Sequence, residues 1–282
     1  MPYRGTEDPY SRSIIMSGDG GPVKQPLKFY SKEPTDVRDI LLQTGKVKTV
    51  YIMDGEPEKV YVHFHDKVTA GNGRRSETME SKGQVCCLIS ALLFEHMEKR
   101  GIRTHFIDVP YLDTLLCKKL TIIPVEVIVR NITAGSIVSQ TTLKEGKLIQ
   151  PPIVEFFLKD DAKDDPLLTG DRVRLMGYDT QPLIDGALLV NTHLQMLFNL
   201  MDIDLVDFKL EFGYDAHGNL LLADELSPDN MRLWAKGTKQ RFDKDLFRKD
   251  EGDIVEAYKY LSLIHISEPT RRTPISYAVF CL

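Results

Sequence analysis

The sequence predicts an α+β protein with a small antiparallel β lobe, a larger α/β lobe and a nucleotide in the cleft between them. Residues 46–64 show the alternating apolar pattern of strands, whereas helical and strand patterns are mixed farther along the chain. Two neighbouring strands near residues 205–234 also carry charged side chains, which are costly to bury unless they are paired or hold a ligand. The fold class therefore rests on these three observations.

The first elements build the small lobe. Residues 46–64 alternate around Asp54-Gly55, a turn dipeptide, and are expected to form a hairpin. Residues 66–76 follow as a polar loop that contains glycines. Residues 84–100 have the spacing of an amphipathic helix that ends at Gly101.

The remaining elements build the larger lobe. Strands are predicted at residues 105–109, 120–129, 205–212 and 219–223, and helices at 191–200 and 253–260. The expected organisation is a mobile arm over 1–40, a β-rich lobe over 41–123, an α/β lobe over 124–260 and a tail over 261–282.

Charged residues on two predicted strands indicate a metal–phosphate site. Asp207, Lys209 and Glu211 alternate with apolar residues and so share one face of the first strand. The second strand ends at Asp224, where a run of three carboxylates begins, with Arg232 close behind. Magnesium prefers oxygen ligands, usually one or two carboxylates together with substrate phosphates. The alternative is a solvated outer face on an edge hairpin.

Two other segments suit phosphate groups. Lys46 and Lys48 follow a glycine that permits close backbone approach, although an exposed strand face explains them equally simply. Arg130 ends a buried strand and is followed by Ser136. Arg130 offers a planar fork of donors, and Ser136 adds a hydroxyl, so together they suit a phosphate or oxyanion. The alternative is an Arg130 paired with a neighbouring carboxylate. The charged run at 159–166 is typical of a solvated loop.

Composition excludes several classes of protein. The net charge of −5 disfavours a nucleic-acid-binding protein. No apolar run approaches the roughly 20 residues that span a bilayer, and the acidic start does not fit a secretory signal. Cys86, Cys87 and Cys117 form no CxxC pair and are expected to be buried in a reducing compartment, so a cytoplasmic location is predicted.

The last 22 residues of the chain are expected to differ in origin from the rest, the alternative being a genuine C-terminal extension. Leu261 to Arg271 and Ile275 to Leu282 resemble a conceptual translation of a transposase-type sequencing adapter. Such a segment has no reason to pack, so residues 261–282 are expected to make no defined contacts with the body of the protein.

The motifs together resemble the phosphoribosylaminoimidazole-succinocarboxamide synthases, the SAICAR synthetase family. The resemblance spans roughly residues 45–260. It is carried by Gly45–Tyr51, Asp66–Gly73, Lys82-Gly83, Pro124–Ser136, Asp161–Pro166, Asp207–Gly213 and Asp224–Trp234. The last three segments are specific in combination, whereas residues 167–190 depart from the family pattern.

The resemblance implies a two-lobed fold with a kinase-like ATP cleft. It implies an ATP- and magnesium-dependent ligase that joins L-aspartate to the carboxylate of carboxyaminoimidazole ribonucleotide through a carboxyl phosphate, giving SAICAR, ADP and phosphate. By this resemblance Lys46 and Lys48 bind the ATP phosphates, and the backbone near Glu126 contacts the adenine. Glu211 and Asp224 hold magnesium, and the ribonucleotide is held by Arg130, Ser136 and Arg232. The resemblance also implies that Lys209 and Asp207 line the reacting centre.

Three other interpretations compete with this one. A nucleotide-binding regulatory protein on the same fold would not need the acids and arginines beyond the ATP site. A kinase acting on a hydroxyl would need a catalytic aspartate in an HRD-like loop, and the sequence has none. The third is an inactive, truncated product. The oligomeric state stays open, including a homo-oligomer.

Overall fold

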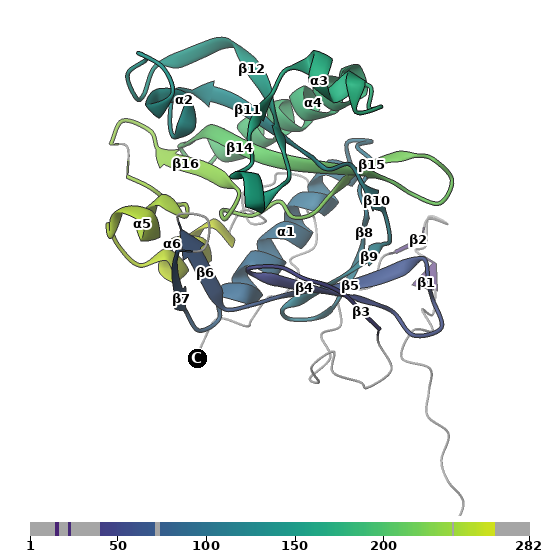
Figure 1. Cartoon of the computed structure of the whole chain (residues 1–282). Helices are drawn as coiled ribbons and strands as arrows, with labels where there is room; N and C mark the ends of the chain where they lie inside the picture. The colour runs from purple at the N-terminus through teal and green to yellow at the C-terminus, as the bar shows by residue number, and fades with distance from the viewer. Residues whose placement is uncertain (1–14, 17–21, 24–39, 71–73, 239, 263–282) are drawn as a thin grey trace, which may run out of the picture.

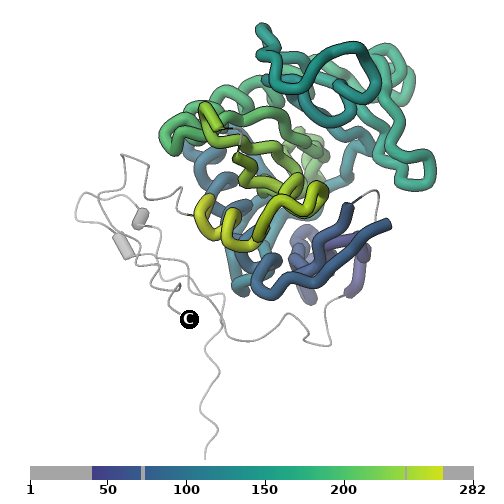
Figure 2. The backbone as a smooth tube through the Cα atoms, turned by 90° about the vertical axis from the view of Figure 1, so that its left-hand side faces the viewer, coloured from purple at the N-terminus to yellow at the C-terminus, as the bar shows by residue number. Residues whose placement is uncertain are grey.

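The chain folds around two antiparallel sheets, each covered by a long helix (Figure 1). The computed structural model describes residues 15–16, 22–23, 40–70, 74–238 and 240–262. Most of the predicted N-terminal arm and residues 263–282 of the predicted tail lie outside the described residues. The α+β class is confirmed. In Figure 2 the purple-to-blue strands and the teal-to-green strands occupy opposite ends of the molecule.

The five-stranded sheet contains the predicted first hairpin. Its strand order is β3 (Ile40–Thr44), β4 (Lys48–Ile52), β5 (Lys59–Phe64), β9 (Thr114–Lys118) and β8 (Phe106–Tyr111). Val50 lies opposite Val62 in the hairpin, and Gly55 adopts the positive φ of 74° that its turn requires. Helix α1 (Lys82–Glu98) packs on this sheet, and the cysteines at 86, 87 and 117 are free and buried, as predicted.

The seven-stranded sheet is organised around one strand, β14 (Ile203–Tyr214). Its strand order is β10 (Thr121–Ile122), β14, β11 (Val125–Ile132), β12 (Leu148–Leu158) and β13 (Leu167–Leu168), while β15 (Leu220–Ala223) and β16 (Met231–Ala235) also pair with β14. The long helix α4 (Thr180–Asn199) packs on β14, β11 and β12.

Shorter elements complete the fold. They are β1 (Ile15–Met16), β2 (Pro22–Val23), β6 (Lys67–Ala70), β7 (Arg75–Thr78), α2 (Ser136–Ser139), the 3-10 turn η1 (Asp161–Lys163), α3 (Gly170–Leu175), α5 (Asp245–Lys249) and α6 (Ile254–Ser262). No helix in this described part of the chain combines the length and apolar character that a membrane crossing requires.

The alternation predicted along β14 is confirmed from Phe208 onward. Phe208, Leu210 and Phe212 are buried in the main core, and Phe212 reaches Gly186 of α4. A bulge after Leu205 breaks the alternation, so Val206 joins a separate small cluster instead of the main core. The charged residues that alternate with the phenylalanines therefore lie on the sheet face that α4 does not cover.

Backbone hydrogen bonds join the seven-stranded sheet to the segment that leads into β8 of the five-stranded sheet. Leu222 of β15 donates its N–H to the Arg103 carbonyl over 3.0 Å, and its own carbonyl accepts from His105 N–H over 2.9 Å. The boundary predicted after residue 123 is not marked by a break in bonding, because β10 already pairs with β14. That boundary stays a prediction.

Three element predictions are wrong in part. The segment over 66–76 is not a loop but contains the paired strands β6 and β7, with residues 71–73 outside the described part. Helix α4 begins at Thr180 rather than at 191, because Asp179 caps it by accepting from Gln181 N–H over 3.0 Å. The strand predicted over 120–129 is divided into β10 and β11 at Pro124, which lacks an N–H for the ladder.

The predicted boundary of the tail at residue 261 cuts through a helix. Ile254, Tyr258 and Leu261 follow one another at helical spacing along α6, and all three are fully buried. The expectation that the tail makes no defined contacts is therefore wrong for Leu261 and Ser262. An apolar residue at the right helical phase is buried whatever the origin of its codon.

Gly83 in the first turn of α1 gives a test of packing. A Cβ there would lie 2.5 Å from the Phe64 carbonyl oxygen, which is backbone and cannot rotate away. We expect Gly83→Ala to lower the free energy of unfolding by about 1–3 kcal/mol in urea denaturation. Gly170→Ala, also in a first helical turn, is the control, because its Cβ would meet only side chains at ordinary contact distances, Arg174 at 3.4 Å and Thr180 at 3.9 Å. Equal stability of the two variants would show that α1 can move away from Phe64 at no cost, contrary to this expectation.

Candidate active site

A row of paired charges crosses the uncovered face of the seven-stranded sheet. In the register, Arg130 of β11 lies opposite Asp207 of β14, and Asp207 lies opposite Arg232 of β16. Directly opposed residues on one face are close enough for their side chains to interact. The sheet thus places one buried carboxylate between two guanidinium groups, and all three come from different strands.

The Arg130 side chain is buried, and the structure accounts for each of its donor nitrogens. Its Nε donates to Glu155 over 2.6 Å, and Nη2 donates to the Ser136 hydroxyl over 2.7 Å. Its Nη1 donates to Asp207 over 3.1 Å and to the Ala134 carbonyl over 3.2 Å. These bonds hold the guanidinium plane against the turn that begins α2.

Arg232 lies beside the same turn. Its Nη1 donates to both Asp207 carboxylate oxygens, over 3.0 and 2.8 Å, and its Nε donates to Asp245 over 3.1 Å. A Cβ on Gly135 would lie 2.5 Å from the Arg232 guanidinium, so the glycine leaves the space that this group occupies. Two arginines, a hydroxyl and a glycine turn form a group of anion donors, which we call the arginine cluster (Arg130, Gly135, Ser136 and Arg232).

The next residues on the same face of β14 form a second group. Lys209 donates to Glu126 over 2.7 Å and to Glu211 over 3.1 Å, and Lys159 forms an ion pair with the other oxygen of Glu211. Glu211 is almost completely buried, whereas Lys209 is part-exposed. Burial favours the neutral amine, but Glu211, Asp224 and Glu126 outweigh it and raise the pKa of Lys209, which therefore stays charged.

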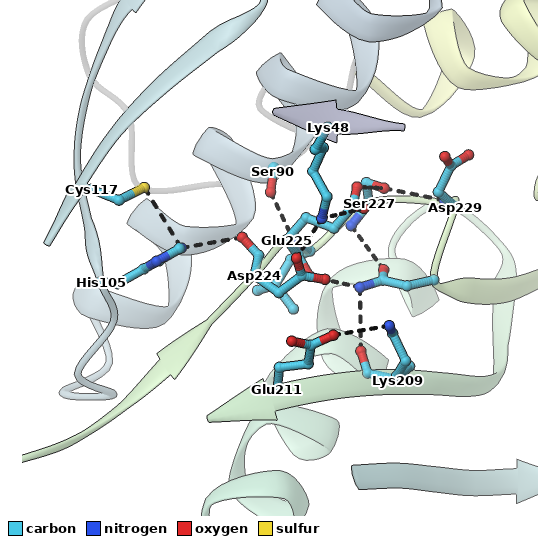
Figure 3. Close-up of polar contacts among 12 residues, drawn as sticks. Lys48, Ser90, His105, Cys117, Lys209, Glu211, Asp224, Glu225, Ser227 and Asp229 are labelled. Atoms are coloured by element: carbon cyan, nitrogen blue, oxygen red, sulfur yellow. Dashed lines mark hydrogen bonds and ion pairs between the residues drawn. The ribbon is translucent and has the colours of Figure 1, made fainter. Parts of the chain in front are cut away.

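An ion pair with the five-stranded sheet completes the site (Figure 3). Lys48 at the start of β4 contacts Asp224, and its Nζ lies 2.8 Å from Glu225 Oε1. Burial would lower the pKa of Lys48, but the two carboxylates raise it above its ordinary value. Asp224 itself has a φ of 61°, a left-handed conformation that is costly for a residue with a side chain and is found at functional sites.

Asp224 and Glu211, the two residues predicted to hold magnesium, have lysine neighbours in common. Figure 3 shows both carboxylates on one side of β14 with Lys209 beside them. Lys159 and Lys209 contact Glu211 and also lower the pKa of Asp224, together with Lys48, against the effect of burial. Two converging carboxylates among lysines are an oxygen donor set of the kind that magnesium uses.

The donor set fits a cation that is shared with phosphate rather than one held by protein alone. Among the described residues, no group of three or more His, Cys, Asp or Glu side chains is arranged to hold a metal ion. Magnesium usually keeps several waters and takes one or two carboxylates plus substrate phosphates. Glu211 and Asp224 satisfy that smaller requirement.

His105 supports the site from behind. Because a carbonyl oxygen can only accept, Nε2 of His105 donates to the Asp224 carbonyl over 3.1 Å. The ring is buried beside Cys117 and stacks edge-on against Phe94. Burial lowers the pKa of His105 to about 4, so the ring is neutral near pH 7.

The structure separates some residues that the sequence grouped. Lys46 lies apart from Lys48 and pairs with Asp161 at 2.7 Å on the exposed surface. The resemblance implied that Asp207 lies beside Lys209 at the reacting centre. The side-chain hydrogen bonds of Asp207 among the described residues are to Arg130 and Arg232. The alternative interpretation of Arg130, as the partner of a carboxylate, is confirmed, and the structure adds a hydrogen bond from Arg130 to Ser136.

Sequence reasoning missed two members of the site. Glu225 follows Asp224 directly and contacts Lys48, but adjacent residues on a strand ordinarily point to opposite faces. The left-handed Asp224 removes that alternation. Lys159 was assigned to a solvated loop because charged runs usually are, yet it pairs with the buried Glu211. No local pattern in the sequence distinguishes it from its neighbours.

The known proteins named below, which this chain resembles, all belong to one family. Residues 41–262 match the family described as SAICAR synthetase. The phosphoribosylaminoimidazole-succinocarboxamide synthase of Synechocystis sp. is 48% identical over 226 residues, covering 77% of this chain and 85% of that protein. The Methanocaldococcus jannaschii enzyme of the same name is 44% identical over 225 residues, covering 78% and 92%.

Solved structures agree with the sequence matches. A structure described as SAICAR synthetase (Type-2) in complex with ADP is 38% identical, with a TM-score of 0.77 over 80% of this chain and 97% of that one. The enzyme from Ehrlichia chaffeensis is 35% identical, with a TM-score of 0.76 over 81% and 99%.

Asp207 provides a test of the charge row. We expect Asp207→Asn to lower the free energy of unfolding by about 3–5 kcal/mol, because two arginines lose the carboxylate that both contact in the protein interior. The exposed pair of Asp171 and Arg174 is the control, and Asp171→Asn should cost no more than about 1 kcal/mol. Urea unfolding measures both. A similar cost for the two variants would show that the Asp207 pairs are worth no more than surface pairs.

His105 predicts a dependence of stability on pH. The unfolded imidazole takes up a proton near pH 6.5, whereas the folded one does so only near pH 4. Protons therefore bind preferentially to the unfolded chain in this window, so stability is complete above pH 6.5 and falls as the pH drops toward 4. We expect His105→Gln to reduce the slope of the unfolding free energy against pH by up to about 1.4 kcal/mol per pH unit in this window. Parallel pH profiles of variant and wild type would refute this assignment.

Proposed function

The chain belongs to the SAICAR synthetase family, ATP-dependent carbon–nitrogen ligases of purine biosynthesis, and on that premise we propose that the uncovered face of its seven-stranded sheet carries the ligase reaction. The observation that supports this most is the division of that face into two halves. One half is the arginine cluster, and the other contains Lys48, Lys209 and the carboxylates of Glu211 and Asp224. β14 contributes residues to both halves.

The arginine cluster is the proposed site for the phosphate of carboxyaminoimidazole ribonucleotide. Arginine presents a planar fork of donors that matches phosphate oxygens. Asp207, Glu155 and Asp245 already orient the two guanidinium groups, so little side-chain freedom is left to lose on binding. We therefore assign Asp207 to orienting the arginines rather than to the reacting atoms.

The acidic half is the proposed site for ATP with magnesium. Lys48 would contact the ATP phosphates from the five-stranded sheet, and Glu211 and Asp224 would hold the cation. Lys46, which faces Asp161 at the surface, and the backbone near Glu126 are proposed to contact the nucleotide farther from the reacting phosphoryl group. When bound, magnesium would neutralise charge on the phosphate oxygens.

The reaction follows from this arrangement. A carboxylate is a poor electrophile, so the substrate carboxylate first takes the terminal phosphoryl group of ATP and releases ADP. The neutral amine of L-aspartate then attacks the carboxyl carbon. The C–N bond forms, the C–O bond to the phosphoryl group breaks, and the proton lost by the amine leaves with the phosphate as hydrogen phosphate. In this proposal Lys209 and Lys48 would stabilise the negative charge that accumulates during phosphoryl transfer, and both hold their protons firmly because their pKa values are raised.

The two halves also argue against the competing interpretations. A nucleotide-binding regulatory protein has no use for a second anion site on the same strand. A kinase that phosphorylates a hydroxyl needs a base near the terminal phosphate, whereas the described carboxylates there are paired with lysines. A carboxylate acceptor needs no such base.

Omission of substrates tests the proposed function. ADP release is measured with ATP, magnesium, ribonucleotide and L-aspartate, and then with each left out in turn. We expect full release only with all components. Release that is unaffected by omitting the ribonucleotide would contradict the proposal and favour an ATPase, and the absence of release in the complete mixture would favour the inactive product.

Single substitutions test the division of the face. Arg232→Lys should raise KM for the ribonucleotide by about one to two decades with much less effect on KM for ATP, because lysine replaces a bidentate fork poorly. Lys48→Ala should show the opposite selectivity. Steady-state kinetics with each substrate varied separately decides between them. If Arg232→Lys weakened ATP and spared the ribonucleotide, the two halves would be assigned the wrong way round.

A further inference from the structure

The segment Asp224–Asn230, which we call the acidic loop, is held by bonds from several directions. The Asp224 carbonyl accepts from His105, and Leu226 N–H donates to the Ser90 hydroxyl of α1 over 2.9 Å. The Asn230 side chain donates to the Glu225 carbonyl over 2.6 Å. These bonds support a backbone that includes the left-handed Asp224.

Asp229 anchors the far end of the acidic loop. It is a buried carboxylate that pairs with Lys82 at the start of α1 and accepts from the Tyr258 hydroxyl of α6 over 2.8 Å. Both of its oxygens are therefore bonded to residues outside the loop. Figure 3 shows its carboxylate directed away from Lys209 and Glu211, so Asp229 belongs to the scaffold of the site rather than to its contents.

Tyr258 brings the last described helix into this scaffold. The side chain is fully buried, in line with Ile254 and Leu261 on the face of α6 that packs against α1. Lys82 and Ser90 lie on α1, and both bond to the acidic loop. The loop is thus held between two helices that themselves pack together, and neither helix contributes to the sheet face where substrates would bind.

We propose that Tyr258 and Lys82 are positioning residues for nucleotide binding, which act by holding Asp229 so that the acidic loop presents Asp224 and Glu225 in the geometry that ATP requires. This inference rests on the proposed function. It gives α6, an element near the end of the chain, a part in nucleotide affinity although it lies outside the site. A merely stabilising role would change the melting temperature and leave substrate affinities alone.

The test removes one oxygen atom. Tyr258→Phe keeps the ring and loses only the bond to Asp229, and we expect KM for ATP to rise about threefold to tenfold with KM for the ribonucleotide nearly unchanged. Tyr260→Phe is the matched control, because Tyr260 lies in the same helix as Tyr258 but is part-exposed, and its ring stacks on Phe242, which lies outside that helix. It should match the wild type in both constants.

A binding measurement separates this inference from the proposed function. The dissociation constant for ADP with magnesium, obtained from the rise in melting temperature with ADP concentration, requires no turnover. We expect it to weaken about threefold to tenfold in Tyr258→Phe, and at least as much in Asp229→Asn, while Tyr260→Phe stays unchanged. The inference would be overturned if the Tyr258→Phe and Asp229→Asn variants both folded and bound ADP as tightly as the wild type, whatever their melting temperatures. Equal weakening of both substrates in kinetics would also overturn it.

Discussion

Charges buried on β14 constrain the rest of the structure, because each must be paired where water is largely excluded. Asp207 and Glu211 are both almost completely buried, and they are matched by Arg130 and Arg232 in one case and by Lys159 and Lys209 in the other. Lys209 lies on β14 itself, and the other three partners come from three different segments of the chain. Those three segments cannot shift along β14 without leaving a charge unpaired, so the pairs specify the arrangement of the sheet while they form the site.

The same requirement links the two sheets. Lys48 extends from β4 to Asp224 and Glu225, which lie at the end of β15. Asp224 adopts its left-handed backbone where the chain leaves that strand, and His105, Lys82 and Ser90 support the turn from the side of α1 and β8. The strained backbone is thus located where the two halves of the molecule meet, and the ion pair across them holds it there.

The sequence predicted most of the sheet and half of the site. Alternation on β14, the Asp54-Gly55 hairpin and the strand before Asp224 are local patterns, and the structure contains each of them. The start of α4 was missed because Gly186 interrupts its apolar pattern, although that glycine fits against Phe212. Lys159 could not be assigned, because its partner Glu211 lies 52 residues away and only the tertiary fold brings them together.

Family resemblance assigned Asp207 and Lys209 to one reacting centre, whereas the structure gives the two side chains separate sets of partners. Asp207 lies two residues before Lys209 on β14 and contacts Arg130 and Arg232. Lys209 contacts Glu126 and Glu211 instead. Periodicity reports the face of a residue but not its cross-strand neighbours, which depend on register. The bulge after Leu205 shows the same limit, because nothing local in the sequence indicates it.

Because β14 contributes residues to both halves of the site, its backbone sets the distance between the two groups that would bind the substrate. Residues two apart on a strand are separated by about 6.6 Å, so Asp207 and Glu211 are held about 13 Å apart by the extended chain itself. Loop movements cannot change that spacing, since β14 is paired along both edges. A substrate whose anionic group binds at the arginine cluster and whose phosphoryl-accepting group lies near Glu211 would have to match this distance. Accepting a much longer or shorter molecule would require one of the two groups to move to another position along β14, not a new loop.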